Sequence, residues 1–120
     1  MSTQDTCCTM VPYFKASSGN LERLKNLCEK FVAKTREETK CLYYGFSFHG
    51  DEAHCREGHE DAEGLLAHLD NVGPLLDELL TISEITRLEV HGPEEELAKL
   101  REPLAKLDPT YFTLEYGFRR

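Results

Sequence analysis

The 120-residue sequence contains no tryptophan, no long apolar run and no excess of positive charge. No apolar stretch approaches the roughly 20 residues that a membrane-spanning helix needs. The 14 lysines and arginines are outnumbered by 22 aspartates and glutamates, and the resulting net charge of −8 repels phosphate backbones and anionic membrane surfaces. We therefore expect one soluble domain that binds neither nucleic acid nor a membrane.

Cysteine pairing motifs are missing as well. The five cysteines are an odd number and include no C-x-x-C pair, which excludes an even disulfide framework. Residues 1–10 have neither the basic start and apolar stretch of a signal peptide nor the arginine enrichment of a transit peptide. We therefore expect a reduced, cytoplasmic protein with a single domain over residues 10–120. Cys7 and Cys8 should be the exposed, oxidisable thiols, in a flexible tail over residues 1–9.

Apolar periodicity predicts the elements of this domain. They are a strand over 10–15, a helix from Leu21, hairpin strands over 42–49 and 53–59, a helix from Glu60 that ends at Gly73-Pro74, a short helical turn over 75–80, a strand over 82–91, a helix from Pro93 that Pro103 kinks or splits, and a strand over 110–118. Pro12 counts against the first strand, because proline is at home on a sheet edge or a bulge.

The order βαββαβ with an appended αβ predicts an α+β, ferredoxin-like fold with helices on one side of the sheet. A homodimer that packs sheet on sheet is the simplest cover for the other side. Within the hairpin, an even-length turn places two sets of alternate residues on one face. These sets are Leu42, Tyr44, Phe46 and Phe48 on the first strand, and Ala53, Cys55, Glu57 and His59 on the second. An acid and an imidazole thus fall on an aromatic face.

Several short motifs resemble the antibiotic biosynthesis monooxygenase family. They are Val11-x-Tyr13, a helix led by Gly19, Thr35-Arg36-x-Glu38-x-x-Cys41-Leu42-x-Tyr44, and Arg56-Glu57-x-His59-x-Asp61-x-x-x-Leu65-x-x-His68-Leu69. The likeness covers about residues 10–91. It implies a ferredoxin-like domain that dimerises into an α+β barrel, and several members of the family oxidise quinols or polyketide anthrones without metal or flavin.

The resemblance also suggests which side chains carry the chemistry. Glu57, Asp61 and His68 match positions of the family motif, whereas His59 stands where the family usually has tryptophan. The haem-degrading branch uses a histidine late in the second helix, and residues 71–80 contain none, so haem degradation is not expected.

We expect a cleft between sheet and helices that holds a small hydrophobic or aromatic molecule. Its walls are predicted to be Tyr13, Tyr44, Phe46, Glu57, His59 and His68. If the protein is an enzyme, it is a monooxygenase that acts without a cofactor on an electron-rich aromatic or quinol. His59 or His68 would then be the base and Glu57 the group that orients it.

Other interpretations remain open. Glu57 and His59 can form a buried polar network with protein groups, in a non-catalytic barrel of the stress type or one that binds a hydrophobic ligand. A metal-dependent isomerase or lyase could use Cys55, His59 and His68 as ligands. Strand alternation sends His54 to the opposite face, and no short zinc spacing occurs, so no metal or cofactor is expected.

Overall fold

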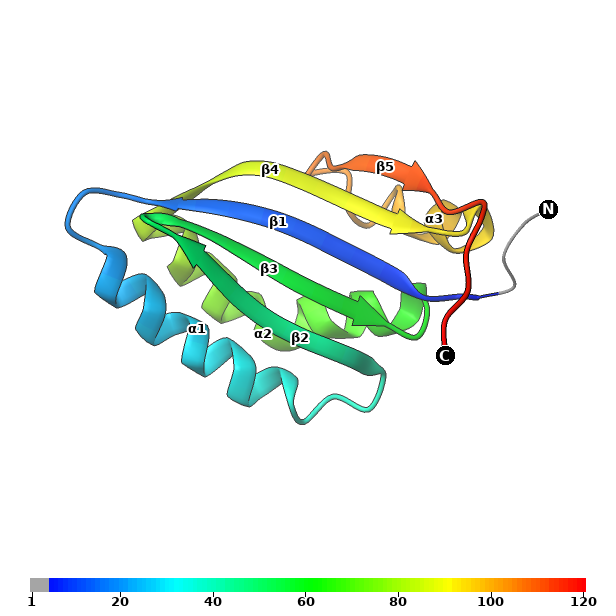
Figure 1. The fold of residues 1–120 in the computed structure, drawn as a ribbon, viewed down its shortest axis with the longest axis horizontal. Helices are drawn as coiled ribbons and strands as arrows, with labels where there is room; N and C mark the ends of the chain where they lie inside the picture. Colours follow the sequence, from blue (N-terminus) through cyan, green and yellow to red (C-terminus); the bar gives the residue numbers. More distant parts are fainter. Residues whose placement is uncertain (1–4) are drawn as a thin grey trace.

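Residues 5–120 are the part of the chain that the computed structural model describes, and they form a sheet with helices on one face (Figure 1). In chain order the elements are β1 (Cys8–Ala16), α1 (Leu21–Thr35), β2 (Cys41–His49), β3 (Glu52–His59), α2 (Ala62–Ile82), β4 (Ser83–Gly92), α3 (Glu94–Leu100) and β5 (Thr110–Thr113). The strands lie in the order β2-β3-β1-β4-β5, and all neighbours are antiparallel except β4 and β5. The predicted α+β, ferredoxin-like architecture with an appended αβ unit is confirmed.

The hairpin of β2 and β3 has the predicted register. Gly50 and Asp51 form the turn between the paired residues His49 and Glu52, and Gly50 takes a positive φ of 61° that glycine adopts without strain. Three further pairs follow the predicted facing: Tyr44 with Glu57, Phe46 with Cys55, and Phe48 with Ala53. Leu42 departs from the alternation, because the register shifts between Cys41 and Tyr43.

Pro12 lies in a central strand, although a proline favours an edge. The pairing of β1 with β3 includes Met10 and Tyr13 but neither Val11 nor Pro12. The His54 side chain fills this break, since its Nδ1 lies 3.2 Å from the Pro12 carbonyl oxygen. The proline therefore occupies a gap in the ladder where no N–H is required.

α2 is one continuous helix, and the predicted end at Gly73-Pro74 is wrong. Its start agrees with the prediction, because the Asp61 side chain accepts a hydrogen bond of 2.8 Å from the Gly64 N–H. Beyond Pro74 the buried residues Leu79 and Ile82 continue the apolar face on which Val72 lies. Burial of this face outweighs the one helical hydrogen bond that the proline removes.

The C-terminal elements are shorter than predicted. α3 ends at Leu100 and the chain continues in turns through Pro103, so this proline follows the helix instead of kinking it. β5 covers only four residues, and Tyr116 and Phe118 beyond it are 77% and 80% exposed. The predicted half-buried strand over 110–118 is therefore wrong after Thr113.

The N-terminal cysteines are buried, in contrast to the prediction. Cys8 opens β1 opposite His59, and both Cys7 and Cys8 lie in the interior. The predicted flexible tail over residues 1–9 therefore overlaps β1, and residues 1–4 lie outside the described part. All five cysteines are free, and Cys41 is the one that is partly exposed. No helix within residues 5–120 is long and apolar enough to cross a membrane.

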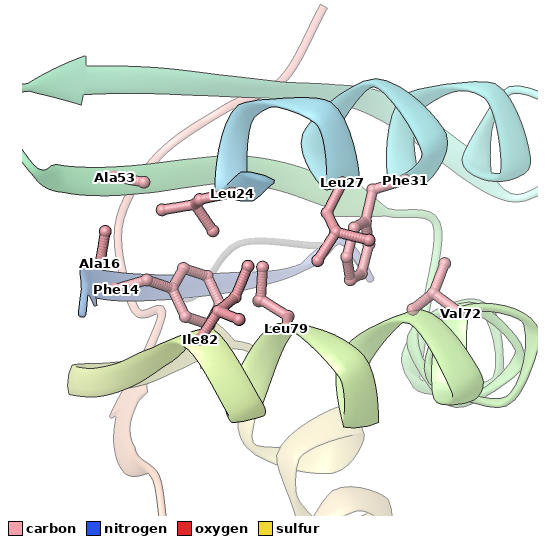
Figure 2. Close-up of a cluster of buried hydrophobic side chains, with 9 residues drawn as sticks. All are labelled: Phe14, Ala16, Leu24, Leu27, Phe31, Ala53, Val72, Leu79 and Ile82. Carbon is pink, nitrogen blue, oxygen red and sulfur yellow. The ribbon is translucent and has the colours of Figure 1, made fainter. Parts of the chain in front are cut away.

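Two apolar clusters fill the space between sheet and helices. Figure 2 shows the first, which consists of Phe14, Ala16, Leu24, Leu27, Phe31, Ala53, Val72, Leu79 and Ile82. The second consists of Cys8, Met10, Ala62, Leu65, Val90, Leu97, Leu100 and Leu104. α2 contributes Leu65 to the second cluster and Val72 to the first. His68 lies between these two residues along the helix, so its imidazole enters the interior where the two clusters meet.

Candidate functional site

Glu57, His59 and His68 come together in the interior, as their predicted common site requires. Alternation along β3 directs Glu57 and His59 toward α2, which carries His68. The Nε2 atom of His59 lies 3.0 Å from Glu57 Oε1, and the Nε2 atom of His68 lies 3.4 Å from the same oxygen. The three side chains are at most 4% exposed, so Glu57 joins two imidazoles away from bulk water.

A second carboxylate, Glu38, holds the other side of the His68 ring. Its two oxygens lie 3.1 and 2.9 Å from His68 Nδ1. The Asn71 amide donates to Glu38 across 2.8 Å and to the Lys34 carbonyl across 3.1 Å, which fixes the carboxylate beside the ring. Glu38 is part of the Thr35-Arg36-x-Glu38 motif, but it is not among the site residues that the sequence predicts.

The two imidazoles differ in their hydrogen-bonding partners. Each nitrogen of His68 faces a carboxylate, so a protonated ring can donate on both sides at once. Among the described residues, His59 Nδ1 has no hydrogen-bond partner, and the ring is anchored through Nε2 alone. His68 is therefore the imidazole that meets a carboxylate at each ring nitrogen.

An apolar cavity of about 40 Å³ lies against this polar group. Glu57 and His68 are on its wall, whereas His59 is not. The remaining lining is Met10, Pro12, Phe14, Phe31, Tyr44, Phe46, Cys55, Leu69, Val72, Leu76, Leu79, Ile85, Leu88 and Leu107. A cavity this small holds a few waters, at about 10–15 Å³ each, whereas benzene occupies an engineered cavity of about 150 Å³. An aromatic ligand therefore requires the surrounding side chains to move apart.

Tyr44 and Phe46, two of the predicted walls of the cleft, line the cavity. The Tyr44 ring centroid lies 5.1 Å from that of His68 and 5.6 Å from that of Phe46. Burial raises the pKa of Tyr44, and the neighbouring Cys55 and Glu57 raise it further. Burial and the Glu57 charge likewise raise the pKa of the Cys55 thiol. Both groups stay protonated near neutral pH, so they can donate hydrogen bonds but cannot act as the base.

Tyr13 lies on the opposite face of the sheet and does not border this cavity. Its ring stacks on His54 with a centroid distance of 4.5 Å. The helix-facing residues of β1 near the site are Met10, Pro12 and Phe14, and alternation sends Tyr13 the other way.

An open, more polar pocket of about 240 Å³ lies beside the cavity. It is lined by Val32, Thr35, Arg36, Glu38, Cys41, Leu42, Tyr43 and Tyr44. Tyr44 borders both spaces. The pair of His68 and Glu38 spans the wall between them, because His68 lines the cavity and Glu38 lines the pocket.

Two groups of side chains in the described part could bind a metal ion. They are Glu57, His59 and His68, and Glu38, Cys41 and His59, in each of which the ligand atoms lie within 4.8 Å of one another. Cys55 belongs to neither group, so the ligand set considered from the sequence is not the one assembled. In the observed geometry Glu57 and Glu38 already accept hydrogen bonds from His59 and His68. The expectation that no cofactor is needed stays a prediction.

Comparison with solved structures places the chain among known proteins. It is 48% identical to MupZ from Pseudomonas fluorescens, with a TM-score of 0.94 and a match that covers 100% of this chain and 94% of MupZ. Rv0793 from Mycobacterium tuberculosis is 18% identical over 72% of this chain and 94% of its own, with a TM-score of 0.65. A protein described as an antibiotic biosynthesis monooxygenase is 17% identical over 69% of this chain and 92% of its own, with a TM-score of 0.61. These two share the fold. No protein-family model and no curated protein matches the sequence.

Proposed function

Because this chain belongs to the antibiotic biosynthesis monooxygenase-like family, we propose that it is a small-molecule monooxygenase that acts without a cofactor. Its substrate is an electron-rich aromatic or a quinol. The observation that carries the proposal is the contact between Glu57 and His68 on the wall of an apolar cavity. A base in such surroundings can form an organic anion, which is the species that reacts with oxygen when no cofactor supplies electrons.

His68, Glu57 and His59 have different roles in proton removal. His68 Nε2 takes a proton from a substrate hydroxyl or an activated C–H, and Glu57 stabilises the resulting imidazolium from 3.4 Å. His59 does not touch the cavity, so it acts as a positioning residue that holds Glu57 through the 3.0 Å hydrogen bond.

The anion then reduces molecular oxygen, and the substrate supplies all the electrons. For an anthrone-type carbon, two C–H bonds break and one C=O bond forms. One oxygen atom enters the product and the other leaves as water with the two protons. The apolar wall of Phe46, Leu69 and Val72 excludes bulk water from the intermediate.

A second candidate is an acid–base reaction that consumes no oxygen, such as an isomerisation or an elimination. It is favoured by Tyr44 and Cys55, whose raised pKa values keep them protonated on the same cavity wall as Glu57. A base such as His68 can remove a proton at one atom and return it at another, while hydrogen bonds from Tyr44 and Cys55 stabilise the anion formed in between.

We also propose that the protein is a cytoplasmic homodimer. The helices cover one face of the sheet, and no element within residues 5–120 covers the other (Figure 1). Strand alternation places Tyr13, Tyr43 and Phe112 on that uncovered face. Five free cysteines suit a reducing compartment. Sedimentation should give a dimer, and a monomer at micromolar concentration contradicts the proposal.

Oxygen uptake tests the proposed reaction. Purified protein is incubated with a panel of hydroquinones and anthrones in an oxygen electrode, and ¹⁸O₂ labelling identifies the product oxygen. Glu57→Gln and His68→Gln should each lower turnover by about 100-fold or more. The matched control is His54→Gln, which alters a histidine of the same sheet on the opposite face and should leave turnover unchanged.

Each outcome distinguishes the candidate functions. Oxygen uptake that depends on Glu57 and His68 supports the monooxygenase. Exchange of substrate hydrogen with deuterated solvent, without oxygen uptake, supports the second candidate. Saturable binding of panel compounds with neither reaction supports the non-catalytic, hydrophobic-ligand interpretation and overturns both enzymatic proposals.

A further inference from the structure

The His68 ring lies between the apolar cavity and the more polar pocket. On one side Nε2 meets Glu57 at the apolar cavity, and on the other Nδ1 meets Glu38, which lines the open pocket. Exposure rises in the same direction, because the His68 and Glu57 side chains are 3% and 4% exposed and that of Glu38 is 10% exposed. Glu38 is thus the member of this group that water reaches.

A proton taken up in the cavity needs a way out. The cavity is lined almost wholly by apolar side chains and the His68 side chain is 3% exposed, so bulk water does not reach a proton on Nε2 directly. An imidazole can accept a proton at one nitrogen and release another from the second nitrogen. The alignment of carboxylate, ring and carboxylate provides such a path with contacts of 3.4 and 2.9 Å.

We propose that Glu38 is the outer end of a proton relay that runs from the apolar cavity through His68 to the open pocket. This relay rests on the proposed function, for which it supplies the exchange of protons with solvent. The ring starts with its proton on Nδ1. It receives the substrate proton on Nε2, and the imidazolium then gives up the Nδ1 proton to Glu38, which passes it to water in the pocket.

The return path resets the ring. Glu38 takes a proton from the pocket and delivers it to Nδ1, and the imidazolium gives its Nε2 proton to the product. The ring again carries its proton on Nδ1, and no proton is gained or lost over the cycle. Asn71 supports both directions, since its hydrogen bond to Glu38 keeps the carboxylate against Nδ1.

Exchange of the ring protons tests this relay without any substrate. Nitrogen-15 labelled histidine allows NMR to measure how fast the His68 ring protons exchange with water in the full-length protein. Glu38→Gln keeps an oxygen that can accept from Nδ1 but cannot carry a proton, so exchange should slow by about 10-fold or more. The control is Glu37→Gln, which removes the same charge from an exposed neighbour and should not change the rate.

Two further measurements separate a relay from a purely structural role. Formate is a small carboxylate that fits the open pocket, and it should restore exchange in Glu38→Gln in proportion to its concentration. In the protein without substitutions, alkylation of the partly exposed Cys41, which lines the pocket, should slow exchange of the His68 ring protons, because the added group obstructs the access of water to Glu38. This second measurement remains decisive if Glu38→Gln fails to fold.

Once a substrate is found, Glu38→Gln should lower kcat by about 10- to 100-fold, with KM within about two-fold, and formate should restore kcat. If the His68 ring protons exchange at an unchanged rate in Glu38→Gln, the relay is overturned, even if the protein is an active monooxygenase. Where this variant does not fold, an unchanged rate after Cys41 alkylation overturns it in the same way. Slowed exchange with formate rescue supports the relay even if every compound of the panel is inert. The two proposals can therefore fail separately.

Discussion

The hydrogen bond between Glu57 and His59 should couple these residues energetically, and a double-mutant cycle can measure the coupling. The His59 ring is fully buried and donates across 3.0 Å to a carboxylate that is 4% exposed. A hydrogen bond to a charged group contributes about 1.5–3 kcal/mol. We expect a coupling energy of this size from the cycle formed by wild type, Glu57→Gln, His59→Gln and the double variant. Each single variant should cost more than the coupling, because it leaves a buried polar partner without its acceptor or donor.

Urea unfolding at pH 7 supplies the free energies. With a slope of about 2 kcal/mol per molar urea, a coupling of 2 kcal/mol corresponds to a departure of about 1 M from additive midpoints. The control cycle pairs Glu57→Gln with His54→Gln on the opposite face of the same strand, where the two changes should add. A Glu57–His59 coupling below about 0.5 kcal/mol would show that the buried carboxylate is held by other groups, and the positioning role of His59 would be refuted.

Three shorter predictions concern the rest of the chain. Asp61→Ala should cost about 1 kcal/mol of unfolding free energy through the lost helix cap, and Asp61→Asn much less. The hydrogen bond from Lys40 lowers the pKa of Asp61 in the folded protein. The Asp61 charge therefore stabilises the fold at pH values above the pKa of an unfolded aspartate, and this stabilisation is lost as pH falls through the lower, folded pKa. The urea midpoints of wild type and Asp61→Asn should accordingly converge as pH falls below about 4. Maleimide should label Cys41 alone, at a rate that rises toward pH 11, since burial raises the pKa of this thiol to about 11; fast labelling of a second thiol in the native protein would contradict the observed burial. Dialysis against a chelator should leave oxygen uptake unchanged, and a loss that added metal restores would show that the buried carboxylates and imidazoles bind an ion.

The hairpin and the facing of its side chains could be predicted because both depend on local rules. A two-residue turn and the alternation of a strand are enough to bring Tyr44 opposite Glu57. To predict the contact between Glu57 and His68, one must also know that α2 packs on this face of the sheet. The ferredoxin-like fold class implies that packing.

The role of Glu38 could not be predicted in the same way. Its bond to His68 joins residues 30 positions apart, from a connecting segment and a helix. No periodicity places the end of a loop against a particular turn of a helix, and only the packing of α1 on α2 determines that contact. The motif that contains Glu38 drew attention to the segment without indicating its partner.

The continuous α2 shows how a strong local signal can be outweighed. Gly73-Pro74 is a common end of a helix, yet the apolar residues on both sides of it follow one helical period from Val72 to Leu79. For the end of this helix, the length of the apolar face in the sequence is a better predictor than Gly73-Pro74. Burial of that face against α1 and the sheet stabilises the helix by more than the missing hydrogen bond costs.

The position of His59 shows how the site differs from one with a tryptophan there. This residue stands where the family usually has tryptophan, and it does not line the cavity but binds the carboxylate that does. An indole can donate a hydrogen bond from its one N–H, but it cannot accept a proton. With an imidazole at this position, Glu57 contacts a ring nitrogen on each side, and Glu38 lies beyond the second ring. The histidine at this position therefore acts on the site through Glu57, whose carboxylate it holds against the cavity.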